Sequence, residues 1–174
     1  TVNALIGAAF GSSGERCMAI SVAVAVGSET ADNLIAGLKS KMIDLKVGNF
    51  DNIKNDFGPL ITKDHMEKVK EYITSAEAQG ADIVVDGRSV NVKGCENGFY
   101  VGGTLIDSVE ASMKSYREEI FGPVLQVVRV ENMQQAIDLI DDHEYGNGTC
   151  IFTRDGEAAR YFSDQIKVGM VGIN

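Results

Sequence analysis

The sequence predicts an α/β fold in which a mostly parallel sheet is covered by helices. Short apolar runs typical of buried strands alternate with segments whose hydrophobic residues recur at helical spacing. Parallel strands need crossover connections, which helices usually supply. The 174 residues are enough for one such unit with a sizeable core, and no repeat or low-complexity linker divides them.

The first half of the chain supplies one strand and two helices. The run 19–26 is typical of a buried strand, and the helix after it has Ser28 or Thr30 as a candidate N-cap. After a loop rich in Gly, Asn and Asp, Thr62 is expected to cap a second helix that ends at Gly80. Helical spacing predicts the inward face of this second helix to be Met66, Val69, Tyr72, Ile73 and Ala76.

The second half supplies extended segments and two more helices. The extended segments are expected at 83–85, 99–106, 124–130, 149–153 and 169–174. Asn132 and Gln135 have the pattern of a capping box at the start of one helix, and the other is expected over 155–165. Cys150 falls in a strand that we expect to be central, which would make it a small core residue.

Charge and composition exclude several classes of function. Sixteen basic residues against twenty-five acidic ones give a net charge of −9, and no basic stripe is visible, so no nucleic acid is expected as a partner. No apolar run reaches the roughly 18 residues of a membrane helix, so no membrane contact is expected. His65 and His143 lie far apart and the three cysteines form no Cys-x-x-Cys pair, so no metal is expected either. Free thiols indicate a reducing compartment.

The chain also lacks the glycine patterns that cradle nucleotide phosphates. Neither G-x-G-x-x-G nor a Walker A sequence is present, so we expect no phosphate-binding loop within these residues. The chain begins at Thr1 and ends at Asn174 in an apolar run, which leads us to expect a piece of a longer polypeptide.

Cys17 stands in the segment GSSGERCM, directly before an apolar strand. The neighbouring Arg16 would favour a thiolate, and the small residues 11–14 would let the backbone approach a substrate closely. Glu15 would oppose the thiolate unless its side chain points away. The alternative is a buried structural cysteine, which is the commoner situation for a lone cysteine before a strand. The residues alone leave both interpretations open.

Two longer segments carry a family resemblance. NALIGAAFGSSGERCMA at 3–19 and YREEIFGPVLQVV at 116–128 resemble the aldehyde dehydrogenase superfamily. The Gly-x-Arg-Cys-Met context, KGCENGFYVGGTLI and YGNGTCIFT are similar to its methylmalonate-semialdehyde dehydrogenase branch, which is CoA-acylating. The resemblance implies that 1–174 is the Rossmann-like catalytic domain. The NAD-binding domain and the C-terminal assembly segment would then lie outside this chain, which alone is expected to have negligible dehydrogenase activity.

The resemblance also implies roles for individual residues. Cys17 matches the nucleophile, which would attack the aldehyde to form a thiohemiacetal. Transfer of a hydride from that adduct to NAD would leave a thioester on Cys17, and its acyl group would pass to coenzyme A. Glu119 would hydrogen-bond the nicotinamide ribose, and Phe121 would pack near the nicotinamide. Arg16 would hold the carboxylate of a methylmalonate or malonate semialdehyde substrate, or it would pair with Glu15 or another acid.

The resemblance has wider implications for products, assembly and compartment. Loss of CO2 would yield propionyl-CoA or acetyl-CoA, in the catabolism of valine or inositol. The parent is expected to be a homo-tetramer or homo-dimer in the bacterial cytoplasm or the mitochondrial matrix.

Other functions stay open on the sequence. One is a hydrolytic aldehyde dehydrogenase that releases a free acid. A second is a Cys–His hydrolase that uses Cys17 and His143, although the Cys-Gly-(Ser/Ala)-Cys-(Trp/Tyr) signature of papain-like enzymes is absent. A third is a non-catalytic α/β binding module. Among the remaining residues, His143 is expected to contact carbonyls at a helix end, His65 to face solvent, and Cys95 to be exposed.

Overall fold

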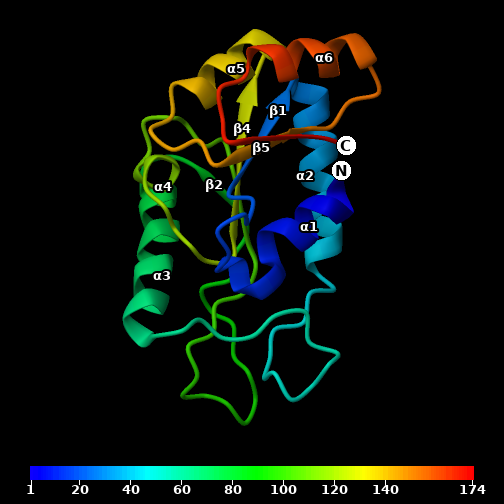
Figure 1. The fold of residues 1–174 in the computed structure, drawn as a ribbon. Helices are drawn as coiled ribbons and strands as arrows, with labels where there is room; N and C mark the ends of the chain where they lie inside the picture. Colours follow the sequence, from blue (N-terminus) through cyan, green and yellow to red (C-terminus); the bar gives the residue numbers. More distant parts are fainter.

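A four-stranded sheet forms the middle layer of the structure (Figure 1). The computed structural model describes residues 1–174. The strand order is β1-β4-β3-β2, and both β1 (Val22–Val26) and β3 (Thr104–Asp107) run parallel to β4 (Val124–Val130). At one edge, β2 (Asp82–Val85) lies antiparallel to β3. The predicted mostly parallel α/β arrangement is confirmed.

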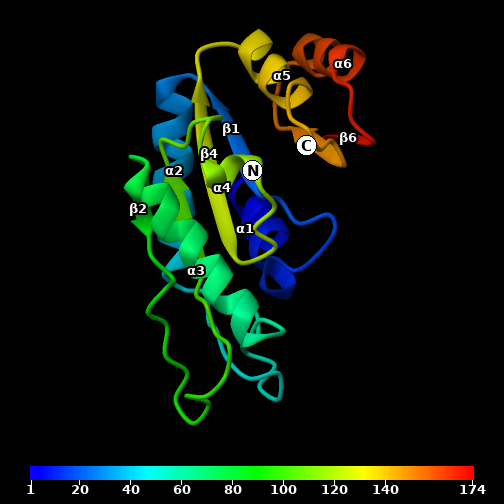
Figure 2. The ribbon, with the colours of Figure 1, turned by 90° about the vertical axis from the view of Figure 1, so that its left-hand side faces the viewer.

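Helices cover both faces of this sheet (Figures 1 and 2). On one face lie α1 (Val2–Phe10) and α2 (Ser28–Met42), and on the other lie α3 (Lys63–Ala78) and the short α4 (Lys114–Arg117). Successive strand residues point to opposite faces, so the strands supply two cores. The core under α1 and α2 includes Leu105, Leu125 and Val127, and the core under α3 includes Ile106, Val124 and Val128.

A second, two-stranded parallel sheet stands to one side of the first (Figure 2). It pairs β5 (Gly148–Ile151) with β6 (Met170–Ile173), and it is accompanied by α5 (Met133–Asp141) and α6 (Gly156–Gln165). Its core is small: Ile137, Phe162 and Ile166. The expectation that Cys150 lies buried in a central strand is wrong, because β5 belongs to this separate sheet and the side chain is exposed.

Helix α3 follows the sequence prediction closely. The Thr62 side chain accepts a hydrogen bond from the His65 amide at 3.1 Å, as an N-cap should. Past the end of the helix, Gly80 has φ of +101°, the left-handed conformation typical of a helix stop. The five residues predicted to face inward are all buried: Met66, Val69, Tyr72, Ile73 and Ala76.

Of two other predicted helix starts, that of α2 differs from expectation, and the cap of α5 by Asn132 is confirmed. Gly27, with φ of +87°, turns the end of β1 directly into α2, so Ser28 is already helical and neither it nor Thr30 is the cap. The Asn132 side chain caps α5 by accepting from the Gln135 amide at 3.0 Å. No α-helix of the structure combines the length and the hydrophobicity that crossing a membrane requires.

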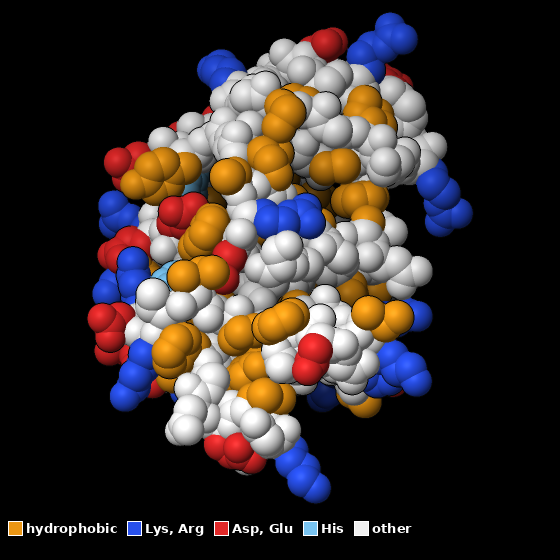
Figure 3. Space-filling view, turned by 60° about the horizontal axis from the view of Figure 1, so that its bottom comes forward, with side chains coloured by type: hydrophobic (Ala, Val, Ile, Leu, Met, Phe, Trp, Pro, Cys, Tyr) orange, Lys and Arg blue, Asp and Glu red, His pale blue; other side chains and the backbone are white.

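The loop between α2 and α3 exposes large hydrophobic side chains. Four of them are more than three-quarters exposed: Ile43, Phe50, Ile53 and Ile61. Viewed from the end of the molecule that carries this loop, hydrophobic side chains are interspersed across the middle of the face, and most charged ones stand toward its edges (Figure 3). The loop between α2 and α3 therefore presents apolar surface that no other part of the chain covers.

Candidate active site

The cysteine segment and the EEIFGPV segment meet at the amino ends of two neighbouring strands. Cys17 precedes β1 and residues 118–123 precede β4, with which β1 pairs in parallel. Asn147, just before β5, reaches the same place, because its side-chain amide donates to the Cys17 carbonyl at 2.8 Å. Ligands of open α/β sheets usually bind beyond the carboxyl ends of the strands. The predicted site residues gather instead at the amino ends of β1 and β4.

The backbone before Cys17 takes an unusual path that brings the two segments into contact. Ser12, Ser13 and Gly14 have φ of +54°, +57° and +71°, three left-handed residues in succession. The Ser13 hydroxyl donates to the Gly58 carbonyl at 2.8 Å, which holds this path. A Cβ atom on Gly14 would collide with the Gly122 carbonyl group, so a glycine is required where the segments touch.

Cys17 lies at the exposed corner of a tight turn. The Ala19 amide donates to the Arg16 carbonyl at 3.0 Å, which closes the turn around the cysteine. The side chain of Cys17 is exposed, so the interpretation as a buried structural cysteine is wrong. The thiol is accessible to a substrate, and its role as nucleophile stays a prediction.

The charged neighbours of Cys17 point in different directions. Arg16 is exposed and forms no ion pair or side-chain hydrogen bond within the chain, so the expected alternative of pairing with Glu15 does not occur. Glu15 is only 10% exposed, and its carboxylate lies 3.7 Å from Nε2 of His65. The acid that would oppose a Cys17 thiolate is thus directed toward a histidine.

His65 is not on a solvated face, contrary to expectation. Its side chain is 22% exposed, and Nε2 lies 2.7 Å from the Phe121 carbonyl oxygen. The first turn of α3 faces the loop before β4, which explains why a position that looks solvated on the helix is covered in the fold. Of the predicted site residues, Phe121 is the one that this histidine contacts.

The two glutamates of EEIFGPV have different surroundings. Glu118 accepts a hydrogen bond from the Tyr72 hydroxyl at 2.7 Å. Burial, together with the hydrogen bond and the charge of Glu118, raises the pKa of Tyr72 to about 12. Glu119 is exposed and its carboxylate has no partner, while the adjacent Phe121 has φ of +54° and is 37% exposed. Glu119 and Phe121 are therefore both accessible, as a role in binding requires.

His143 is occupied by backbone groups. Nε2 lies 3.1 Å from the Tyr116 carbonyl oxygen, and Nδ1 accepts from the Tyr145 amide at 3.0 Å. That carbonyl belongs to α4, while the backbone amide of His143 donates to the Ile140 carbonyl in the last turn of its own helix at 3.3 Å. The expected contact with the end of α5 is thus made by the backbone and not by the ring. Both ring nitrogens are engaged by backbone groups and neither is hydrogen-bonded to Cys17, which argues against a Cys–His hydrolase.

Three residues at the site were not assigned there from the sequence. Asn147 lies in YGNGTCIFT, which carries part of the family resemblance, but no pattern in the sequence indicates its contact with Cys17. His65 and Tyr72 are seven residues apart on one face of α3, so helical periodicity could have placed them together. Which loop that face meets is decided by the tertiary fold. Cys95, predicted exposed, is half-buried and lies in the loop after β2.

The whole chain, residues 1–174, matches the family described as "Aldehyde dehydrogenase family". It is 61% identical over 173 residues to malonate-semialdehyde dehydrogenase of Pseudomonas aeruginosa, covering 99% of this chain and 35% of that protein. It is 47% identical over 174 residues to the rat protein named methylmalonate-semialdehyde/malonate-semialdehyde dehydrogenase (acylating), mitochondrial, covering 100% of this chain and 32% of the relative. The chain spans about a third of the length of these curated relatives.

Solved structures of similar proteins agree in fold. The crystal structure of methylmalonate-semialdehyde dehydrogenase from Oceanimonas doudoroffii matches with a TM-score of 0.97 at 70% identity, covering 99% of this chain and 35% of that one. A Sinorhizobium meliloti protein described as a methylmalonate-semialdehyde dehydrogenase, in complex with NAD, matches with a TM-score of 0.97 at 52% identity over the same shares.

Proposed function

This chain belongs to the aldehyde dehydrogenase family, and we propose that it is the cysteine-bearing catalytic part of an NAD-dependent, CoA-acylating semialdehyde dehydrogenase. The substrate would be malonate or methylmalonate semialdehyde, and the products would be acetyl-CoA or propionyl-CoA, CO2 and NADH. The observation that carries the proposal is the exposed Cys17 at a turn whose backbone contacts the loop of Glu119 and Phe121. The names of the relatives support the choice of substrate.

In this proposal Cys17 performs the covalent chemistry. Its thiolate attacks the aldehyde carbon, a C–S bond forms, and the carbonyl oxygen becomes the oxyanion of a thiohemiacetal. Loss of hydride from that carbon yields a malonyl or methylmalonyl thioester on Cys17. The bond between its carboxylate and the neighbouring carbon breaks to release CO2, and the enolate left behind takes up a proton to give the acetyl or propionyl thioester. The thiol of coenzyme A then attacks the thioester carbonyl; its proton is released, the new C–S bond forms, and the bond to Cys17 breaks. A thioester suits this transfer because another thiol can accept its acyl group with little loss of energy.

Arg16 would recognise the second functional group of the substrate. A semialdehyde of this class carries a carboxylate close to its aldehyde, and a guanidinium can bind a carboxylate with two parallel hydrogen bonds. Arg16 adjoins the nucleophile, and its donors are not used by any carboxylate of the chain. Both facts support a role in holding the substrate.

Glu119 and Phe121 fit the nicotinamide end of NAD. A carboxylate without a partner can accept from two ribose hydroxyls, and an exposed aromatic face can position a flat ring. Bound NAD would supply the acceptor for the hydride. The rest of the dinucleotide needs a phosphate-binding element that these residues do not contain, so we propose that it lies in the remaining two-thirds of the protein.

The hydrolytic alternative differs only in what attacks the thioester. The P. aeruginosa relative is named without the word acylating, whereas the rat relative's name includes it. Water in place of coenzyme A would release a free acid. We favour the acylating reaction because the Gly-x-Arg-Cys-Met context resembles that branch.

Assembly and compartment follow from the same resemblance. We propose a homo-tetramer or homo-dimer of the parent protein. It would work in the bacterial cytoplasm or the mitochondrial matrix, in the breakdown of valine or inositol. The relatives include a bacterial protein and one named mitochondrial, which supports this choice of compartments.

The test uses the full-length protein with NAD and malonate semialdehyde, in the presence and absence of coenzyme A. We expect sustained NADH formation over many turnovers only when coenzyme A is present, and at most one NADH per active site without it, with acetyl-CoA identified by mass spectrometry. CoA-independent turnover to a free acid would move the protein to the hydrolytic dehydrogenases. Absence of NADH under both conditions would overturn the dehydrogenase proposal.

A further inference from the structure

Helix α3 contacts the loop before β4 at two points. His65 and Tyr72, two turns apart on the helix, meet the backbone and a side chain of that loop. Nε2 of His65 lies 2.7 Å from the Phe121 carbonyl oxygen, and the Tyr72 hydroxyl donates to Glu118 at 2.7 Å. Glu119 lies between these two points in the sequence, is exposed, and forms no side-chain hydrogen bond or ion pair. The helix therefore holds the loop on both sides of the residue proposed to bind ribose.

The conformation of Phe121 explains why the loop needs support. Its φ of +54° places an aromatic residue in the left-handed region, which is uncommon for a side chain of this size. Such a residue keeps that conformation only when its surroundings over-determine it. The hydrogen bond from His65 to the Phe121 carbonyl is one such constraint.

His65 also faces the nucleophile segment. The same Nε2 atom lies 3.7 Å from the carboxylate of Glu15, which is 10% exposed and stands two residues before Cys17. One imidazole thus lies between the loop proposed to contact nicotinamide and the segment that carries the thiol. These segments are more than a hundred residues apart in the sequence.

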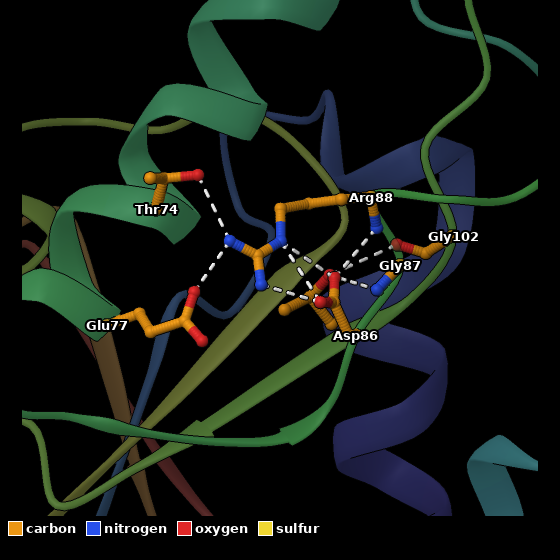
Figure 4. A network of polar contacts seen from close by, with 7 residues as sticks. Thr74, Glu77, Asp86, Gly87, Arg88 and Gly102 are labelled. Carbon is orange, nitrogen blue, oxygen red and sulfur yellow. Dashed lines mark hydrogen bonds and ion pairs between the residues drawn. The ribbon is translucent and has the colours of Figure 1, made fainter.

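The helix that presents His65 is held firmly at its other end. Arg88 donates to Thr74 at 3.0 Å and to Glu77 at 2.8 Å, both on the last turns of α3. The same guanidinium donates two hydrogen bonds to the Asp86 carboxylate, from Nη2 at 2.6 Å and from Nε at 3.0 Å (Figure 4). Together with the fully buried Val69 and Ile73, these contacts make α3 a fixed support for the loop.

We propose that His65 is a positioning residue of this dehydrogenase site. Its Nε2–H donates to the Phe121 carbonyl, and its ring lies beside Glu15. These contacts hold Phe121 and Glu119 at a fixed position relative to Cys17. The inference rests on the proposed function, since it concerns how NAD is received beside the thiol. It predicts that loss of the donor at position 65 weakens NAD binding while the thiol itself is unchanged.

The test compares variants of the full-length protein in NAD binding and in steady-state kinetics. For H65A we expect the Kd for NAD to rise about five- to tenfold, the range set by one lost hydrogen bond. The KM for NAD should change more than kcat. H65Q keeps an N–H donor of similar reach and should restore the Kd to within about twofold of the wild-type value.

H143A is the matched control. His143 forms the same kind of hydrogen bond, 3.1 Å from the Tyr116 carbonyl oxygen, but on the helix before the loop and without a contact to the cysteine segment. It should lower thermal stability at least as much as H65A and leave the Kd for NAD near the wild-type value. Two tyrosine variants form a second comparison. Y72F removes the hydrogen bond to Glu118 and should weaken NAD binding, whereas Y161F removes a hydrogen bond to Gln134 on α5 and should not.

The outcomes separate the two proposals. An unchanged Kd for NAD in H65A would overturn the positioning role, and so would equal losses in H65A and H65Q. If H65A does not fold, H65M, which keeps most of the side-chain volume but has no N–H donor, is measured in its place, and an unchanged Kd for NAD in H65M would overturn the positioning role. Failure of the wild-type protein to bind NAD would overturn the proposed function, and the role of His65 with it.

Discussion

Arg88 and Arg16 lie in loops of the same chain, but their surroundings are opposite. Arg88 is paired with Glu77 at 2.8 Å and with Asp86 at 2.6 Å. Arg129 likewise bridges Asp32 and Asp107, each at 2.8 Å. Arg16, beside the exposed thiol, has no carboxylate partner in the chain.

The same contrast holds for the acids in these regions. In the Arg88 network every charge has an opposite charge within reach, as expected of contacts that hold loops to helices. At the site, Glu118 is bonded by Tyr72, whereas the adjacent Glu119 is left free. The fold thus pairs Arg88 with acids and leaves Arg16 and Glu119 without ion pairs or side-chain hydrogen bonds, so both side chains are available to a ligand beside Cys17.

The largest expected effect is that of removing the thiol. C17A in the full-length protein should lower kcat by on the order of 10³-fold or more, because no covalent intermediate can form. Since the side chain is exposed, thermal stability should change little. C150A, at the other exposed cysteine, is the control and should keep nearly full activity. Equal losses in the two variants would contradict the distinction.

Replacing Arg16 or Arg88 by methionine should have different consequences: the first for catalysis, the second for stability. R16M should lower kcat/KM for the semialdehyde about 10- to 100-fold, because a charge-assisted hydrogen bond to the substrate carboxylate is lost. R16M should leave the free energy of unfolding unchanged. R88M should lower the free energy of unfolding by about 1 kcal/mol or less, since its partners Glu77 and Asp86 are 53% and 40% exposed. Denaturant titrations and substrate kinetics on both variants measure the two effects.

Gly14 lies where the cysteine segment touches the loop before β4. G14A should lower the free energy of unfolding by about 1–3 kcal/mol, because a left-handed residue gains a Cβ that collides with the Gly122 carbonyl. G7A is the control: a Cβ there meets no atom within 4 Å in the middle of α1, so stability should stay equal or rise slightly. A G14A variant as stable as G7A would show that the close approach of the segments is not needed.

The smallest expected effect is the pH dependence of the Tyr72 contact. Burial and Glu118 raise the pKa of Tyr72 from 10.0 to about 12 in the folded protein. A raised pKa means that the contribution of Tyr72 to stability is present below pH 10, the ordinary value, and is lost as the pH rises toward 12. The difference in unfolding free energy between the wild-type protein and Y72F should therefore shrink over that window. A difference that grew there would contradict the assigned cause.

Local patterns account for the parts of the fold that the sequence predicted well. Strand β4 and the buried face of α3 follow from periodicity, and Thr62 caps its helix because the cap acts within a single turn. Helix α1 was not expected, since its run of small and apolar residues, VNALIGAAF, shows no amphipathic period. The separation of β5 and β6 into their own sheet depends on long-range pairing, which a single sequence does not display.

Family resemblance predicts the site more strongly than any physical pattern in the sequence does. Cys17 and Arg16 were suspected from their neighbours, but the residues alone left a structural cysteine as the commoner alternative. The contacts of His65 with Phe121 and of Asn147 with Cys17 join positions 56 and 130 residues apart. Geometry of this kind becomes visible only when the chain is folded, and it is the part that explains how the segments are held together.

The most direct test of the central claim is to trap the acyl group on the enzyme. The full-length protein is incubated with NAD and malonate semialdehyde without coenzyme A, quenched in acid, digested and analysed by mass spectrometry. The account predicts an acyl adduct on the peptide that contains Cys17, lost when coenzyme A is added and absent from the Cys150 peptide. NADH formation with an unmodified Cys17 peptide under these conditions, or an adduct on another cysteine, would contradict it.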